Sequence, residues 1–225
     1  STLRSGSGQV QQTGNMIVWD WKSTPQLKNV DSQEEASVDF YVKVKDNWVP
    51  TDSNPEKMVI SDQINISQIT KKFEIKVSSG LGISQSATSD LQDAESLAAG
   101  QKSFYTIGWE ISNHSSDMKN VKVKAKLPAN VELTGQILPA DESSNFSFDS
   151  ASREIVWSAG DIGAGVGVTG DPEALYFQVS ITPTAQQIAN AAELIGQVVV
   201  TGENQFTNSV SSSSYGPIVS GVIVK

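Results

Sequence analysis

Apolar and polar residues alternate with a period of two along much of this chain. Apolar side chains stand at every second position from Tyr105 to Ile111 and from Val121 to Leu127, and in the second stretch the intervening residues are lysines. The same alternation runs through residues 38–44 and 73–77. Successive side chains of a β-strand point to opposite faces, so this pattern predicts strands with one buried and one solvated face. Such strands are typical of antiparallel sheets.

Turn-forming residues separate these segments. Residues 112–117 are rich in Ser and Asn, Pro128 ends the lysine-bearing stretch, and residues 160–172 are rich in Gly and Asp. Gly and Asn supply the positive φ that such turns need, and Pro stops strand pairing. Helical patterns are short: we expect one or two turns within 185–193, with 90–99 as a second candidate. Many short strands with frequent turns predict an all-β fold, a sandwich or a barrel.

The sequence also repeats itself. Trp19 and Phe40 have counterparts in Trp157 and Phe177, 138 and 137 positions later, which indicates one structural unit used twice. The second copy has a front half, at about residues 85–135, that the first copy lacks. We therefore predict an incomplete, later-strand repeat at 1–77 and a complete repeat at 78–225.

An incomplete sandwich has an open sheet edge and an uncovered apolar face, which favour the addition of a strand. We expect residues 1–77 to be ordered by contact with a neighbouring chain or with another segment of a longer polypeptide. The predicted partners are neighbouring repeats of the same protein or identical chains. The boundary between the repeats falls at residues 77–84, where the sequence predicts a strand that continues through a glycine-rich kink into the next unit. We expect a connection this short to limit hinge motion between the units.

Three segments resemble a known family. They are W-E-I-S-N at 109–113, V-K-V-K-A-K-L-P-A-N-V at 121–131 and I-V-W-S-A-G-D-I-G-A-G at 155–165. They resemble the Ig-like tandem repeats of bacterial and archaeal surface proteins, in which an N-x-s turn precedes a strand ending in L-P-x-x-V and a v-W-x-x-G-x-i-x-x-G hairpin follows. The resemblance covers residues 100–181 and 12–45, although no glycine stands at 29–31 of the first unit.

This resemblance implies tandem Ig-like β-sandwiches with antiparallel sheets, exposed outside the cell as stalk, wall or layer material. It implies no active site, because the family has no catalytic residues to transfer. The pairing of a truncated with a complete repeat is similar to envelope proteins of ultra-small, uncultured bacteria.

Composition narrows the classes of partner. The 225 residues include no cysteine and carry a formal net charge of −9. Disulfides and cysteine-based zinc sites are therefore excluded, and the basic face typical of nucleic-acid binding is not expected. No apolar run approaches the roughly 20 residues of a membrane span, so we expect a membrane to be reached only through segments outside this chain.

Candidate chemistry is sparse. The single histidine, His114, stands in a polar turn beside serines, and we expect it to be structural or solvent-exposed and not part of a catalytic triad. The chain is therefore predicted not to be an enzyme. Calcium is the one candidate cofactor, because Asp161, Asp171 and Glu173 fall in loops that could converge at one end of the sandwich.

Exposed aromatic residues are candidates for binding surface glycans by stacking. They are Trp21, Tyr41, Trp48 and Tyr215, with core or interface packing as the alternative role. Trp19 and Trp157 stand at matching positions of the repeat and are predicted to lie in the core.

The sequence contains candidate sites for two kinds of covalent modification. N-x-S sequons occur at Asn65, Asn113 and Asn145, a pattern that is common by chance. A Lys–Asn cross-link beside Glu110 would require a buried acid, whereas the alternation places Glu110 on the polar face of its strand.

The sequence thus favours a non-catalytic, extracellular or cell-surface module that forms part of a stalk, filament or surface layer. Two alternatives stay open. One is an adhesion module that binds glycans or another protein, and the other is an accessory domain of a larger secreted enzyme.

Overall fold

The computed structural model describes residues 2–5, 9–11, 16–43, 58–78, 80–89, 99–186 and 191–220. The chain divides into two compact units, Ser1–Val49 and Pro50–Lys225, and each is described by itself. The predicted repeats, 1–77 and 78–225, were defined by recurrence in the sequence and not by compactness in space. This division therefore stays a prediction.

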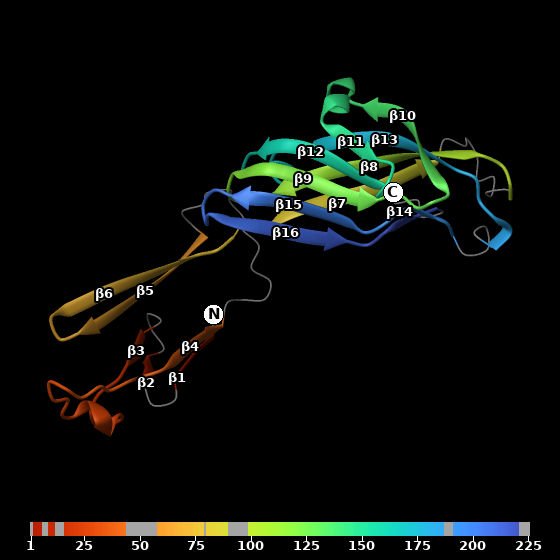
Figure 1. Cartoon of the computed structure of the whole chain (residues 1–225). Helices are drawn as coiled ribbons and strands as arrows, with labels where there is room; N and C mark the ends of the chain where they lie inside the picture. Colours follow the sequence, from red (N-terminus) through yellow and green to blue (C-terminus); the bar gives the residue numbers. More distant parts are fainter. Residues whose placement is uncertain are drawn as a thin grey trace. The chain divides into compact units, whose positions relative to one another are not determined.

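Two antiparallel sheets form the body of the second unit (Figure 1). The four-stranded sheet has the order β10-β13-β8-β7, and the five-stranded sheet has the order β11-β12-β9-β15-β16. Their bounds are β7 (Leu81–Ser89), β8 (Ser103–Asn113), β9 (Met118–Lys126), β10 (Val131–Leu138), β11 (Phe146–Asp149), β12 (Glu154–Ile162), β13 (Glu173–Ile181), β15 (Val198–Asn204) and β16 (Ser209–Tyr215). Every strand pair in the described residues is antiparallel, which confirms the predicted all-β fold class.

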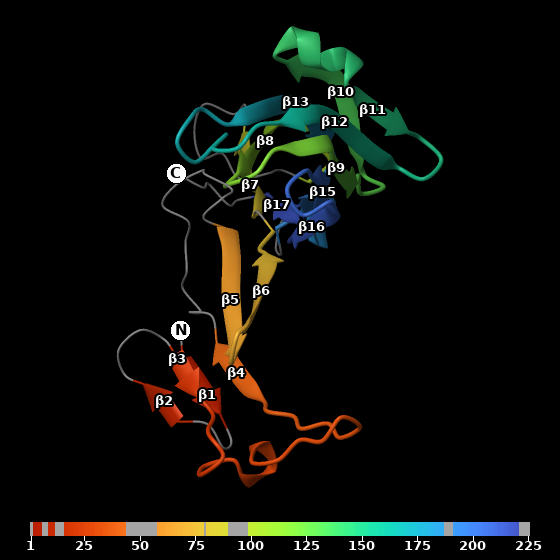
Figure 2. The ribbon, with the colours of Figure 1, turned by 90° about the vertical axis from the view of Figure 1, so that its left-hand side faces the viewer.

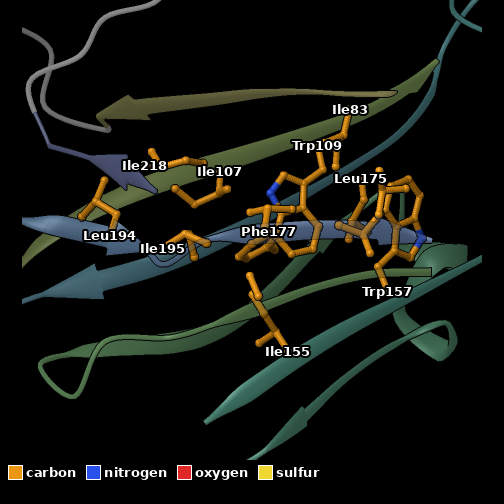
Figure 3. Packing of buried hydrophobic residues seen from close by; sticks show 14 of the residues in the cluster. Ile83, Ile107, Trp109, Ile155, Trp157, Leu175, Phe177, Leu194, Ile195 and Ile218 are labelled. Atoms are coloured by element: carbon orange, nitrogen blue, oxygen red, sulfur yellow. The ribbon is translucent and has the colours of Figure 1, made fainter. Parts of the chain in front are cut away.

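One apolar core lies between the inner faces of these sheets. Figure 3 shows Trp109 and Phe177 at its centre, where their rings meet edge to face with centroids 5.0 Å apart. Trp157 is fully buried in the same cluster, as the sequence predicted. The alternating residues of β8, β9 and β13 supply most of the remaining side chains, because every second residue of these strands points inward.

A bulge interrupts β9 near its start. Met118 and Val121 are both buried although three positions separate them, and Asn120 between them has φ 52°. The backbone N–H of Asn120 donates to the Oδ1 of Asp161 on the neighbouring strand β12. The bulge restores the phase of the lysine-bearing alternation that follows.

Shorter elements complete this unit. A 3₁₀ turn, η3 (Ala140–Ser144), precedes β11, and a small two-stranded sheet pairs β14 (Glu193–Ile195) with β17 (Ile218–Val219). Of the described residues in the predicted 185–193 helix, Ala185 and Gln186 are helical, and Glu193 begins β14. Residues 187–190 lie outside the described residues, as does most of the 90–99 candidate.

A long hairpin, β5 (Val59–Ile66) and β6 (Ile69–Lys76), belongs to the same unit but to neither sheet of the sandwich. Figure 2 shows it as a ribbon of two strands. The alternation in β6 predicted a half-buried strand, and this is wrong: every residue of β6 is exposed. The apolar side chains do share one face, but no second layer covers that face in the described residues.

The first unit contains two small sheets. β1 (Thr2–Ser5) pairs with β4 (Phe40–Lys43), β2 (Gln9–Gln11) pairs with β3 (Met16–Val18), and a 3₁₀ turn, η1, spans Pro25–Leu27. Trp19, predicted to be in the core, is only half-buried, with its ring 6.0 Å from that of Phe40. Among residues 16–43, Thr24 is the one fully buried residue, so the described residues of this unit do not form a core like that of the second unit.

The strand pairs of the first 77 residues recur in the sandwich. Gln9 pairs with Val18, and the residues numbered 138 higher, Ser147 and Val156, are paired in β11–β12. Likewise β1 pairs with β4 as β10 pairs with β13, and β5 pairs with β6 as β15 pairs with β16. The strands of the sandwich without a counterpart among the described residues before Val77 are β7, β8 and β9.

Candidate interaction surface

His114 is partly buried at the start of the connection between β8 and β9. Its backbone N–H donates to the carbonyl oxygen of Gly80 at 3.2 Å. Its ring Nδ1 is buried, with no hydrogen-bond partner among the described residues. In a Ser-His-Asp triad a carboxylate orients the histidine through one ring nitrogen, and within the described part of the chain Nδ1 makes no such bond.

The three calcium candidates occupy different local environments. Asp161 accepts the hydrogen bond from Asn120 in the β9 bulge, Asp171 lies in the loop before β13, and Glu173 begins β13. Among the described residues, no group of three or more His, Cys, Asp or Glu side chains could hold a metal ion. Calcium binding by these residues stays an untested prediction.

A cluster of acidic residues lies beside the core tryptophan. The indole Nε1 of Trp157 donates to the Oε2 of Glu142 at 2.6 Å, and the side-chain amide of Asn145 also donates to Glu142. Partial burial raises the pKa of Glu173, with further repulsion from Glu142 and Asp141. Glu142 therefore gives the buried indole a charged acceptor at the cost of repelling Glu173.

Asn113 holds one end of the sandwich together. Its side chain is fully buried, and its Nδ2 donates to the carbonyl oxygens of Ser116, Ile162 and Gly163 at 2.8, 3.2 and 3.0 Å. Its backbone carbonyl accepts from the N–H of Gly165. Asn113 of this sequon therefore has a structural role, because a buried amide nitrogen that donates to three acceptors cannot carry a glycan in the folded state.

Of the other candidate modification sites, Asn65 and Asn145 are exposed and Glu110 is half-buried. The Oδ1 of Asn65 accepts from Gln63 and Thr70 on the hairpin. Glu110, considered as the acid of a Lys–Asn cross-link, accepts a hydrogen bond from the hydroxyl of Tyr176 at 2.8 Å. That bond raises the pKa of Tyr176.

The aromatic candidates are not gathered on one surface. Trp21 is 52% exposed, with the Nζ atoms of Lys22 and Lys28 5.8 and 5.6 Å from its ring centroid, and Tyr41 is 73% exposed. Both belong to the first unit, and Trp48 lies outside the described residues. Tyr215 is half-buried in the second unit.

A shallow hollow lies beside Tyr215. Its lining also includes Ile83, Gln85 and the 216–219 segment. The Nε2 of Gln85 donates to the carbonyl oxygen of Gly216 at 3.3 Å, which joins β7 to the segment after β16. Tyr215 also packs against the edge of the core, so the interface-packing alternative describes this residue better than an open stacking site does.

The most unusual surface in the described residues is one face of the β5–β6 hairpin. Directly opposed residues of an antiparallel pair share a face, and the opposed pairs here place six large apolar side chains on one face, which also carries Asp62 and Lys71: Ile60, Ile64, Ile66, Ile69, Phe73 and Ile75. Five of them are exposed by 37% to 68%. Complete burial of each would contribute roughly 1.5–3 kcal/mol, so this face is a strong candidate for an interface.

The other face of the hairpin is polar. Ser61, Gln63, Lys72 and Glu74 lie on it, and the Nζ of Lys72 is 2.7 Å from a carboxylate oxygen of Glu74. The hairpin is thus amphipathic in the same manner as a strand pair that covers a core. A two-stranded sheet alone is marginally stable in water, which also favours a covered state. The sequence indicated this face through its alternation but not its lack of cover.

The hairpin continues directly into the sandwich. β6 ends at Lys76 and β7 begins at Leu81. The Nζ of Lys76 donates to the carbonyl oxygen of Phe206 at 2.9 Å, and the hydroxyl of Ser78 accepts from the side-chain amide of Asn204 at 3.3 Å. These bonds join the connection to the loop between β15 and β16.

Comparison with known proteins shows only a partial structural likeness. No family model matches the sequence. No curated protein matches it either. The full-length major pilin SpaD of Corynebacterium diphtheriae is 14% identical, with a TM-score of 0.37, over 61% of this chain and 35% of that one. BcpA, the major pilin subunit of Bacillus cereus, is 11% identical, with a TM-score of 0.36, over 70% of this chain and 50% of that one.

The chain therefore spans between about a third and a half of the length of these two pilins. Among the helices of the described residues, none has the length and apolar character that crossing a bilayer requires.

Proposed function

We propose that this chain is a non-catalytic structural module of a protein exposed on the cell surface, where repeated β-sandwiches form part of a stalk, filament or layer. In this proposal residues 1–77 are the later strands of one repeat and residues 78–225 are a complete repeat. The predicted partners are other repeats of the same protein or identical chains.

The recurrence of strand pairs is the observation that carries this proposal. β2–β3 matches β11–β12 residue for residue at an offset of 138, and β1–β4 and β5–β6 have the same pairing partners in order as β10–β13 and β15–β16. Stacked units that each contact their neighbours are typical of extended repeat proteins, whose length and not a pocket is their functional property.

The connection between β6 and β7 supports the same role. Only residues 77–80 separate the two strands, and Lys76 and Ser78 are hydrogen bonded to the β15–β16 region. A short connection with its own hydrogen bonds transmits tension along the backbone better than a long flexible linker. This is the property that a stalk or filament requires.

Immunogold labelling of intact cells tests the proposal. Antibodies raised against the sandwich should decorate the outside of unpermeabilised cells, in lines if the protein forms a stalk or filament and as an even coat if it forms a layer. An antibody against a cytoplasmic protein is the matched control and should label only permeabilised cells. Labelling that appears only after permeabilisation would refute the surface location.

A second candidate function is glycan binding, which the exposure of Trp21 and Tyr41 favours. Aromatic rings bind sugars through their faces, and an exposed ring with neighbouring lysines is suited to acidic sugars. A glycan array probed with the whole chain and with a Trp21→Ala variant separates the two functions. Binding that the substitution abolishes would favour adhesion, whereas no binding to any glycan favours the structural role.

A further inference from the structure

The apolar face of the β5–β6 hairpin corresponds to the core-facing side of β15–β16. β5 ends at Ile66, opposite Ile69 across a two-residue turn, and β15 ends at Asn204, opposite Ser209 across a four-residue turn. Aligning Ile66 with Asn204 places β15 138 residues after β5, the same offset as that between β2–β3 and β11–β12. With this offset the inward-pointing positions of β15 correspond to the apolar face of β5.

The two hairpins differ in what lies beside them. β15 is paired on one side with β16 and on the other with β9, through pairs such as Val200 with Val123 and Asn204 with Met118. β5 is paired with β6, and no strand in the described residues pairs with its other edge. Unpaired N–H and C=O groups along such an edge are a template for another strand.

We propose that the free edge of β5 accepts a strand of the β9 type, supplied by another copy of the repeat. The acceptor is the backbone of Val59–Ile66, and the apolar side chains of the donor join those of the hairpin on one face. This inference rests on the repeat arrangement proposed above but does not depend on the proposed cellular location.

The sequence of β9 shows the chemistry of the donor. Its buried residues Val121, Val123 and Ala125 alternate with exposed lysines. An acceptor of this kind needs apolar side chains on one face and neutral or acidic groups on the other. On β5 the opposite face presents Val59, Ser61, Gln63 and Asn65, none of which is positively charged, while the neighbouring β6 contributes Lys72, Glu74 and Lys76 to that face. The net charge of −9 on the chain also favours a basic strand.

The partner is another copy of the repeat because the missing neighbour has a known counterpart within this chain. In the sandwich, β9 fills the position between β12 and β15 and pairs with both strands. The β9 of this chain is already used in that way. A second β9-type strand must therefore come from a further copy, and it would give β5 the neighbour that β15 has.

A peptide that comprises residues 117–127, D-M-K-N-V-K-V-K-A-K-L, tests this proposal. It is added to the complete 225-residue chain, and amide exchange of β5 and β6 is followed residue by residue by NMR. In β5, alternate amides point away from β6, and we expect their exchange to slow at least about tenfold at saturating peptide. The outward amides of β6 should not change, because its counterpart β16 is an edge strand.

A control peptide keeps every lysine and replaces Val121, Val123 and Ala125 with serine. It separates strand pairing from attraction between a basic peptide and an acidic protein, and we expect it to give no protection. In the protein, Ile64→Ser should weaken binding of the parent peptide by about tenfold or more, because it removes an apolar contact. Gln63→Ser, on the opposite face, should leave binding unchanged.

Three results of the peptide experiment would overturn the proposal. They are unchanged exchange at the β5 amides with the parent peptide, equal protection by the control peptide, and protection at the β6 edge in place of the β5 edge. Protection of the outward β5 amides before any peptide is added, at low protein concentration, would also overturn it, because the edge would then already be paired. Immunogold labelling has no bearing on these results. The proposed surface location and the proposed strand addition can therefore be refuted separately.

Discussion

Replacing Asn113 should damage the sandwich more than its small size suggests. The Asn113→Ala variant leaves the carbonyl oxygens of Ser116, Ile162 and Gly163 without the donor that now serves all three. A buried polar group that loses its partner costs about 1–3 kcal/mol. Since water can reach some of these carbonyls after the side chain is removed, we expect a total loss of about 3 kcal/mol.

Asn113→Asp separates hydrogen bonding from volume. Aspartate has nearly the same shape, but when ionised it has no N–H to donate, and its oxygen would face three carbonyl oxygens. An unpaired buried charge is more costly than a cavity of this size. We therefore expect the Asp variant to be less stable than the Ala variant. If packing alone mattered, the order would be reversed.

Hydrogen exchange of the core strands β8 and β9, read by mass spectrometry, measures the effect within the sandwich itself. A loss of 3 kcal/mol corresponds to exchange that is faster by about two orders of magnitude. Asn145→Ala is the matched control, because its amide donates to Glu142 at the exposed η3 turn, and it should change stability by about 0.5 kcal/mol or less. The reasoning is refuted if the two Ala variants exchange at the same rate.

The remaining predictions concern the acids around Trp157. Glu142→Ala should destabilise the sandwich by about 1–3 kcal/mol in urea unfolding, because it removes the acceptor of a buried indole N–H, whereas Asp141→Ala should have little effect. Trp157→Ala should cost roughly 3–5 kcal/mol, and a variant that melts like the parent would show that the ring does not fill the core. The raised pKa of Glu173 means that its ionised form opposes folding, so stability falls as pH rises above its unfolded value near 4.5. Glu173→Gln should therefore raise the melting temperature at pH 7 and have no effect well below pH 4, and an equal effect at both pH values would exclude charge as the cause.

Local pattern was sufficient to predict the strands that form the core. The alternation at 105–111 and 121–127 lies largely in β8 and β9, and the expected polar connection between them spans residues 114–117. These predictions succeed because the buried positions are set by a period of two that any inward-facing strand must show. The bulge at Asn120 was not indicated, because a single positive φ has no periodic signature.

Contacts between residues that are far apart in the chain could not be predicted from local sequence pattern. Glu142 and Trp157 are 15 positions apart and belong to a 3₁₀ turn and a strand, so no motif joins them. The Asn113 sequon appeared to be a candidate modification site, whereas the loop formed by residues 163–166 folds back to enclose it. The glycine at position 167 is the one feature of the sequence that reflects this enclosure. Gly167 has φ 67°, and a Cβ atom there would lie 2.7 Å from the carbonyl oxygen of Ile111.

Residues 69–76 and 118–126 show that an alternating pattern alone does not predict whether a strand is buried. Both segments alternate apolar residues with lysines or other polar residues, yet β9 buries its apolar face and β6 exposes the whole of its own. The difference lies in the neighbours: β9 is flanked by β12 and β15 and packs on the opposite sheet, while β6 has β5 alone in the described residues. An alternating pattern reports that a sequence is suited to burial, not that the burying partner is present. Where the pattern and the exposure disagree, the disagreement itself indicates a missing contact, and here it lies on a hairpin whose counterpart in the sandwich, β15–β16, has β9 beside it.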